Sequence, residues 1–131
     1  DLIPMGEADL IISLEPMEAL RYLPYLKKDG YVITNSVPFV NIPNYPDQTL
    51  LMKTLEELPH KVILNAEEKA KECGNVKVAN IVMLGAATPF IGISYETLRE
   101  GIRRIFSKKG ESIVELNLRA LEIGKNIAES K

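Results

Sequence analysis

Two polar side chains stand at the ends of mostly apolar runs of the sequence and could bind a ligand. Glu15 follows the run Leu10–Leu14 directly, and Asn35 ends the run Tyr31–Asn35. Such runs of leucine and β-branched residues are typical of strands buried on both faces of a parallel sheet. In open α/β sheets, ligands bind outside the carboxyl ends of the strands. The pattern therefore indicates Glu15 and Asn35 as candidate site residues.

The other reactive side chains predict neither a catalytic group nor a metal site. Cys73 is the only cysteine, which rules out an internal disulfide and an iron–sulfur cluster held by this chain alone. His60 follows Pro59 without an evident partner and is expected on the surface or at a strand end. Cys73 is expected to be a small buried apolar residue. The sequence contains neither GxGxxG nor GxxxxGK[ST], so no phosphate-binding loop is visible.

Hydrophobic periodicity and turn residues place these candidates on an α/β fold. Strand, helix and strand follow one another within the first 35 residues, which predicts a right-handed βαβ unit in which Gly30 ends the helix. We expect strands at 10–14, 31–35 and 60–64. Helices are expected from residue 16 towards Gly30, weakened at Pro24, and at 48–58, 66–73, 80–88, 95–106 and 112–128. Residues 36–46 contain three prolines and predict a rigid loop. The prediction is a single domain over 1–131: a Rossmann-like three-layer domain with a mostly parallel sheet, followed by a C-terminal helical run.

The stretch from Asn80 to Gly92 carries no charge and predicts a buried helix that ends before Pro89. Gly85 in its middle costs about 1 kcal/mol relative to alanine, so we expect close packing against another backbone as compensation. One stripe of the last helix carries Asn117, Ala120 and Gly124, and a second helix could approach closely there. An asparagine that faces the interior must be hydrogen-bonded.

Charge and composition narrow the function classes. Hydrophobic residues make up 46% and charged residues 26% of the 131, and the net charge of −2 gives no electrostatic case for nucleic acid. No apolar run reaches the roughly 20 residues of a membrane span. We therefore expect a cytoplasmic protein that binds neither nucleic acid nor membrane. One helix face is basic, and it is either simply solvated or the contact for an acidic partner: Arg99, Arg103, Arg104, Lys108, Lys109.

Four segments resemble one enzyme family. They are Ala8–Ile12 with Leu14–Arg21, Gly30–Asn35, Asn80–Ala86, and the pattern of Glu115, Asn117, Ala120 and Gly124. Together they resemble the beta subunit of indolepyruvate:ferredoxin oxidoreductases, which belongs to the gamma-type domains of the 2-oxoacid:acceptor oxidoreductases. Members of this family also carry a Gly-x-Gly-Gly-Gln-Gly turn and an Arg-Gly-Gly segment. Neither is present here, and because the sequence starts without methionine we expect both upstream of Asp1.

The resemblance implies a subunit of an oxidoreductase complex found in anaerobic metabolism. The complex would decarboxylate an aryl pyruvate such as indolepyruvate oxidatively to acyl-CoA and CO₂, with ferredoxin as acceptor. Thiamine diphosphate and the iron–sulfur clusters would belong to a large partner subunit, CoA would be a substrate of the complex, and this chain would hold no cofactor and no complete active site. No catalytic residue is carried over. Asn80, Gly85 and Asn117 are motif positions expected to serve packing, and Glu15 and Asn35 are expected to face the partner or substrate.

Two other functions stay open at this point. The chain could be a freestanding Rossmann-like module that binds a nucleotide or CoA. It could also be an assembly piece that forms a homodimer through an uncovered sheet edge, because three parallel strands are few for a well-covered sheet.

Overall fold

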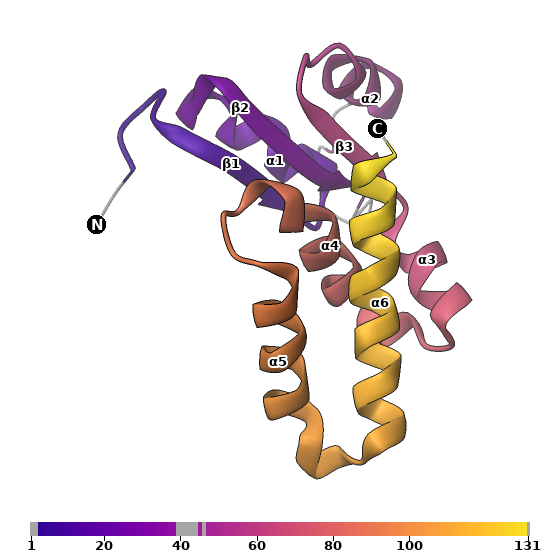
Figure 1. The fold of residues 1–131 in the computed structure, drawn as a ribbon. Helices are drawn as coiled ribbons and strands as arrows, with labels where there is room; N and C mark the ends of the chain where they lie inside the picture. Colours follow the sequence, from indigo (N-terminus) through magenta and orange to yellow (C-terminus); the bar gives the residue numbers. More distant parts are fainter. Residues whose placement is uncertain (1–2, 39–44, 46, 131) are drawn as a thin grey trace. The chain divides into compact units, whose positions relative to one another are not determined.

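The computed structural model describes residues 3–38, 45 and 47–130, and it divides the chain into two compact units, Asp1–Asn65 and Ala66–Lys131. The first unit contains all the strands of the described residues, and the second is helical (Figure 1). This order confirms the predicted α/β class with a parallel sheet followed by a helical run. Each unit is described by itself below.

The first unit is a three-stranded parallel sheet with two helices. Its strands pair in the order β1-β2-β3, with Ile11 beside Val32 and Ile33 beside Val62. The parallel β1–α1–β2 segment confirms the predicted βαβ unit. The elements are β1 (Ala8–Ser13), α1 (Pro16–Tyr22), the 3₁₀ turn η1 (Leu23–Tyr25), β2 (Leu26–Asn35), α2 (Gln48–Glu56) and β3 (Lys61–Leu64).

Helices α1 and α2 bury their apolar faces against one face of this sheet. Ala19 of α1 and Leu55 of α2 are fully buried with Val32 of the middle strand. Partly buried apolar side chains surround these residues, among them Ile11 and Ile63 from the two outer strands. The side of the sheet that carries Ile11, Val32 and Ile63 therefore forms the core of the unit.

Strand β1 is the outermost strand on its side of the described sheet, and its side chains are apolar in both directions. Ile12 is 46% exposed and Leu14, just after the strand, is 50% exposed, whereas Ile33 beside Ile12 is fully buried. Central strands of parallel sheets have such two-sided apolar patterns. Here the pattern lies on an edge strand and leaves apolar surface in contact with water.

The second unit is built on the packing of α4 against α6. A Cβ atom added at Gly85 would lie 2.1 Å from the carbonyl oxygen of Leu121, and one added at Gly124 would lie 1.9 Å from that of Val82. Both glycines therefore let the two backbones touch, which confirms the predicted close approach. The elements are α3 (Ala66–Cys73), η2 (Val76–Val78), α4 (Ala79–Ala87), η3 (Thr88–Phe90), α5 (Tyr95–Phe106), η4 (Ser107–Lys109) and α6 (Glu111–Glu129).

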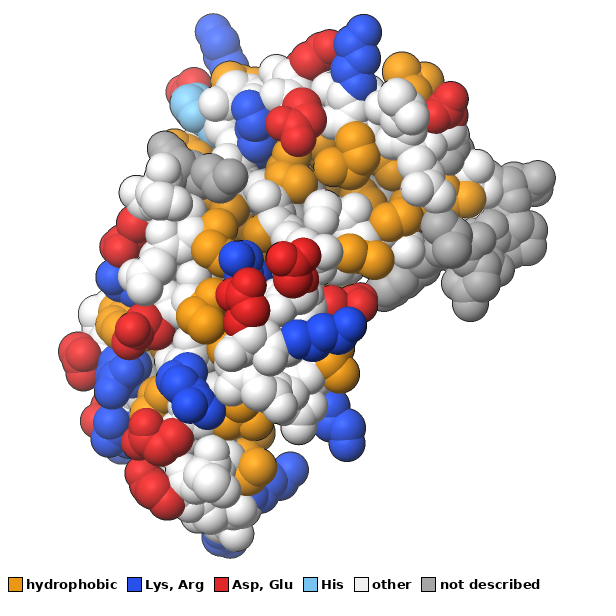
Figure 2. Space-filling view, turned by 90° about the vertical axis from the view of Figure 1, so that its right-hand side faces the viewer, with side chains coloured by type: hydrophobic (Ala, Val, Ile, Leu, Met, Phe, Trp, Pro, Cys, Tyr) orange, Lys and Arg blue, Asp and Glu red, His pale blue; other side chains and the backbone are white. Residues whose placement is uncertain are grey.

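Helices α5 and α6 form a hairpin whose inner side is apolar. Ile102 of α5 packs with Val114 and Leu118 of α6, and all three are buried. The outward side of α6 is charged, and in Figure 2 acidic and basic side chains are interspersed over the lower part of the molecule, where Figure 1 shows α6. The hairpin turns at Gly110, whose φ of 102° lies in the left-handed region that glycine accepts readily.

Three local predictions are wrong. Gly30 does not end a helix: β2 already begins at Leu26, and Gly30 lies where a Cβ would be 3.1 Å from the carbonyl oxygen of Asp9. The apolar spacing of α2 and α5 predicts Leu50 and Ile105 on the inner faces of these helices, but the two residues are 63% and 71% exposed. The predicted loop 36–46 falls largely on residues outside those described.

Candidate functional site

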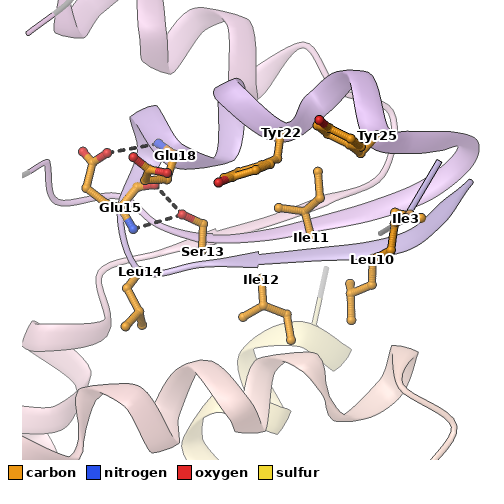
Figure 3. Close-up of a pocket in the computed structure, with 11 residues that line it drawn as sticks. Ile3, Leu10, Ile11, Ile12, Ser13, Leu14, Glu15, Glu18, Tyr22 and Tyr25 are labelled. Carbon is orange, nitrogen blue, oxygen red and sulfur yellow. Dashed lines mark hydrogen bonds between the residues drawn. The ribbon is translucent and has the colours of Figure 1, made fainter. Parts of the chain in front are cut away.

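An open groove of about 810 Å³ runs along the outer side of β1 in the first unit (Figure 3). Leu10, Ile12 and Leu14 point to one side of the strand, and Ile11 points to the other, toward Tyr22 and Tyr25. The groove is lined by Ile3, Ala8, Leu10, Ile11, Ile12, Ser13, Leu14, Glu15, Glu18, Tyr22 and Tyr25. Its walls are therefore mostly apolar, and its carboxylates stand at the end where β1 stops.

Glu15 stands where β1 passes into α1, and its carboxylate is engaged in local structure. One oxygen, Oε1, accepts a hydrogen bond from the backbone N–H of Glu18 at 3.1 Å, so Glu15 caps α1. The other oxygen, Oε2, accepts a hydrogen bond from the hydroxyl of Tyr45. Only 3% of Glu15 is exposed, which is consistent with a buried carboxylate held by two donors.

Tyr45 comes from the segment that precedes α2, thirty positions along the chain from Glu15. Burial of its ring and, second, the hydrogen bond to Glu15 raise the pKa of the Tyr45 hydroxyl above its ordinary value. The proton therefore stays on the tyrosine oxygen, and the pair acts as a donor and an acceptor that tie the α2 side of the unit to the β1–α1 turn.

Asn35 and Ser13 fasten the strand ends themselves. The side-chain amide of Asn35 donates to the carbonyl oxygen of Leu14 at 3.3 Å, which joins β2 to the end of β1. The hydroxyl of Ser13 accepts from the backbone N–H of Glu15 at 3.1 Å and donates to its carbonyl oxygen. We call Ser13, Glu15, Asn35 and Tyr45 the strand-end cluster. All four make hydrogen bonds within the unit, so this geometry suits fixing a rigid strand end better than proton transfer.

The structure therefore brings the two predicted site residues to the same edge of the sheet, as the sequence indicated. Both are buried rather than presented to solvent, since Asn35 is only 4% exposed. Sequence reasoning missed Tyr45 and Ser13. Tyr45 lies in a proline-rich segment with no local pattern that points to Glu15, whereas Ser13, two positions before Glu15, fits a hydroxyl-capped turn at the strand end.

The three motif positions in the second unit have different environments. Gly85 lies at the α4–α6 contact, as described above. Asn117 is 4% exposed, and its amide donates to the carbonyl oxygen of Ile113 at 2.9 Å, one turn earlier in α6. Asn80 is exposed on α4, so its expected role in packing is not supported. None of the three lies in the groove.

The two remaining reactive side chains lie in structural positions. The ring of His60, just before β3, lies 4.9 Å from that of Tyr31. Cys73 is 7% exposed, and burial raises the pKa of its thiol. Within residues 3–38, 45 and 47–130, no group of three or more His, Cys, Asp or Glu side chains could hold a metal ion.

Comparison with known proteins identifies the family. Residues 1–127 match the family described as pyruvate ferredoxin/flavodoxin oxidoreductase. The chain belongs to this family. The assignment confirms the resemblance seen in the four sequence segments and, with it, the prediction of an oxidoreductase subunit.

Curated relatives are more than a third identical to this chain over the aligned residues. The indolepyruvate oxidoreductase subunit IorB of Thermococcus kodakarensis is 38% identical over 138 residues, which cover 98% of this chain and 67% of that protein. The subunit IorB of Pyrococcus horikoshii is 37% identical with the same coverage. The chain therefore spans about two thirds of the length of these relatives.

Solved structures of two ferredoxin oxidoreductases share the fold. A keto/oxoacid ferredoxin oxidoreductase gamma subunit from Geobacter sulfurreducens has a TM-score of 0.68 at 25% identity and covers 99% of this chain and 66% of that one. The 2-oxoglutarate:ferredoxin oxidoreductase from Magnetococcus marinus has a TM-score of 0.71 at 24% identity, with 22% of its chain covered. No helix among the described residues has the length and apolar character needed to cross a membrane.

Proposed function

We propose that this chain is the smaller subunit of a complex that oxidatively decarboxylates indolepyruvate or a related aryl pyruvate. The single observation that carries the proposal is the 38% identity to an indolepyruvate oxidoreductase subunit over 98% of the chain. The reaction would convert the 2-oxoacid and CoA to acyl-CoA and CO₂ and pass two electrons to ferredoxin. It would take place in the cytoplasm.

In this proposal the reacting centre lies on a large partner subunit that binds thiamine diphosphate and iron–sulfur clusters. The strand-end cluster supports this division of labour, because both oxygens of the Glu15 carboxylate already accept hydrogen bonds within the chain. The contribution of this chain includes the apolar groove beside β1 in its first unit. Ferredoxin would then interact with the complex through the large subunit.

Reconstitution tests the proposal. The chain alone should show no ferredoxin reduction with indolepyruvate and CoA, whereas a mixture with the large subunit encoded in the same genome should show it. A panel of indolepyruvate, phenylpyruvate, pyruvate and 2-oxoglutarate at equal concentrations then measures kcat/KM for each acid, and the aryl pyruvates should give the highest values. Turnover by the chain alone would refute the division of labour.

The alternative, a freestanding module for CoA or a nucleotide, rests on the size of the groove and on its two tyrosine rings. Tyr22 and Tyr25 are 49% and 37% exposed, and the centroids of their rings lie 5.9 Å apart. Isothermal titration calorimetry of the isolated chain with CoA, ATP and NAD distinguishes the two functions. Micromolar binding that is lost in the double variant Tyr22→Ala/Tyr25→Ala would favour the binding module.

A further inference from the structure

The turn of the α5–α6 hairpin carries a compact basic surface with an apolar residue in it. This surface consists of the end of α5 and the 3₁₀ turn η4, and we call it the hairpin-tip patch: Arg103, Arg104, Ile105, Lys108, Lys109. All five residues are exposed. Basic side chains stand at the lower end of the molecule in Figure 2, which is the end where Figure 1 shows this turn.

Positive charge is concentrated in the hairpin-tip patch. Residues 103–110 hold four of the sixteen lysines and arginines and none of the eighteen aspartates and glutamates, although the whole chain is negative. On α5 and α6 of the described chain, the ion pairs join Arg99 to Glu96 and Lys125 to Glu129, and they leave the four cations of the patch out. Lys109 lies 6.0 Å from the centre of the Phe106 ring. The patch is thus a local positive field on an otherwise acidic chain.

Helix electrostatics accounts for only part of the pattern. Arg103 and Arg104 lie in the last turn of α5, where cations interact favourably with the helix dipole. Lys108 and Lys109 lie beyond that helix. The helix dipole also gives no reason for an exposed apolar side chain at Ile105. Its 71% exposure is the highest of the large apolar side chains in the described chain. An apolar residue surrounded by charges is the arrangement of a protein interface, with an anchor and a polar rim.

We infer that the hairpin-tip patch docks onto an acidic surface of the large subunit, with Ile105 inserted at the centre of the contact. The inference rests on the proposed function, which supplies that subunit. Charge complementarity requires an acidic partner, because burying or facing four unpaired cations against a neutral or basic surface would be costly. A protein fits better than nucleic acid, since phosphates offer nothing that buries Ile105. It fits better than a lipid surface, since membrane-bound helices present a wide apolar face rather than one residue.

Binding of the full chain to the large subunit, measured by biolayer interferometry, tests the inference. The tip variant carries four charge reversals: Arg103→Glu, Arg104→Glu, Lys108→Glu, Lys109→Glu. The matched control has the same change in net charge at four exposed lysines outside the patch: Lys28→Glu, Lys53→Glu, Lys71→Glu, Lys77→Glu. We expect Kd to rise about 100-fold in the tip variant and less than about threefold in the control.

A second pair of variants tests the apolar anchor without changing charge. Ile105→Ser should raise Kd about tenfold, because it removes apolar surface that the complex buries. Leu50→Ser, at a residue that is 63% exposed on α2, should leave Kd unchanged. Raising the salt concentration from about 0.05 M to about 0.5 M should weaken the wild-type complex and affect the tip variant less. Circular dichroism checks that all variants are folded.

The outcomes separate the docking inference from the proposed function. If the wild-type chain binds the large subunit and the tip variant binds equally well, the docking inference is wrong and the proposed function stands. If the wild-type chain does not bind the large subunit, both are wrong. Two further outcomes would overturn the inference. One is salt-sensitive self-association of the chain through the patch. The other is binding to anionic phosphatidylserine vesicles that the tip variant loses while its binding to the large subunit is unchanged.

Discussion

The outer side of β1 in the first unit and the α4–α6 contact in the second unit use apolar residues in opposite ways. At the α4–α6 contact, Gly85 and Gly124 bring two backbones together so closely that not even a methyl group would fit. Along β1, Ile12 and Leu14 remain about half exposed beside an open groove. At the α4–α6 contact the two glycines have no room for a side chain, so almost no substitution should be tolerated there. On the outer side of β1 the side chains are half exposed, so many substitutions should be tolerated there.

Among substitutions that bury no new charge, the largest expected effect is at Gly124. Gly124→Ala places a Cβ 1.9 Å from the Val82 carbonyl oxygen and 2.7 Å from the Ala86 nitrogen, both of which are backbone atoms that cannot rotate away. We expect a loss of about 4 kcal/mol in the free energy of unfolding, measured by urea denaturation. Gly101→Ala is the matched control, since Gly101 also lies within a helix, α5, and a Cβ there meets nothing within 4 Å. It should stabilise by up to about 1 kcal/mol. If Gly124→Ala and Gly101→Ala changed the free energy of unfolding equally, the close contact between α4 and α6 would be contradicted.

The next largest effect is at the strand-end cluster. Glu15→Ala removes the cap of α1 and leaves the hydroxyl of Tyr45 without its acceptor, so we expect a loss of about 2 kcal/mol in urea denaturation. Glu15→Gln keeps the side chain's shape and an oxygen for the cap, so it should cost less. If Glu15→Ala left the free energy of unfolding unchanged, the strand-end cluster would not be holding the strand end.

The same pair predicts a pH dependence. The pKa of Tyr45 is raised in the folded chain, mainly by burial and next by its bond to Glu15, so the folded state holds this proton more tightly than the unfolded state. The stabilisation is fully present below the ordinary tyrosine pKa of about 10 and is lost as the pH rises toward the folded value. The difference in unfolding free energy between wild type and Tyr45→Phe should therefore shrink above pH 10. If the difference between wild type and Tyr45→Phe stayed constant up to pH 12, the pKa of Tyr45 would not be raised by folding.

Much of this architecture could be predicted from the sequence, because it depends on local patterns. The uncharged runs predicted β1, β2 and the helix around Gly85, and the glycine stripe predicted the close helix contact. The hydrogen bond between Glu15 and Tyr45 joins residues thirty positions apart, and no local pattern reveals such a contact. Ile105 shows a second limit. An amphipathic pattern identifies the apolar face of a helix but not how much of that face its neighbours cover.

A smaller and more uniform effect is expected at the helix caps, one in each unit. The side chain of Asp47 accepts from the backbone N–H of Thr49 at 2.9 Å, and that of Ser94 accepts from the backbone N–H of Thr97 at 3.1 Å. Asp47→Ala and Ser94→Ala should each cost about 1 kcal/mol in urea denaturation. A loss at one cap that is several times the loss at the other would show that the two units respond differently to the same change.

The smallest effect on stability is expected along β1, where the change should instead be seen in association. Ile12 is 46% exposed on an edge strand, so Ile12→Lys loses little buried surface and should change the unfolding free energy by only about 0.5 kcal/mol. An exposed apolar edge strand favours pairing between chains, and a lysine there opposes it. Sedimentation velocity over a range of concentrations should show less self-association for Ile12→Lys than for wild type.

Ile33→Lys, at a fully buried neighbour in β2, should instead unfold the protein. If Ile12→Lys were as destabilising as Ile33→Lys, the outer side of β1 would be a packed interior surface, and the contrast with the α4–α6 contact would fail.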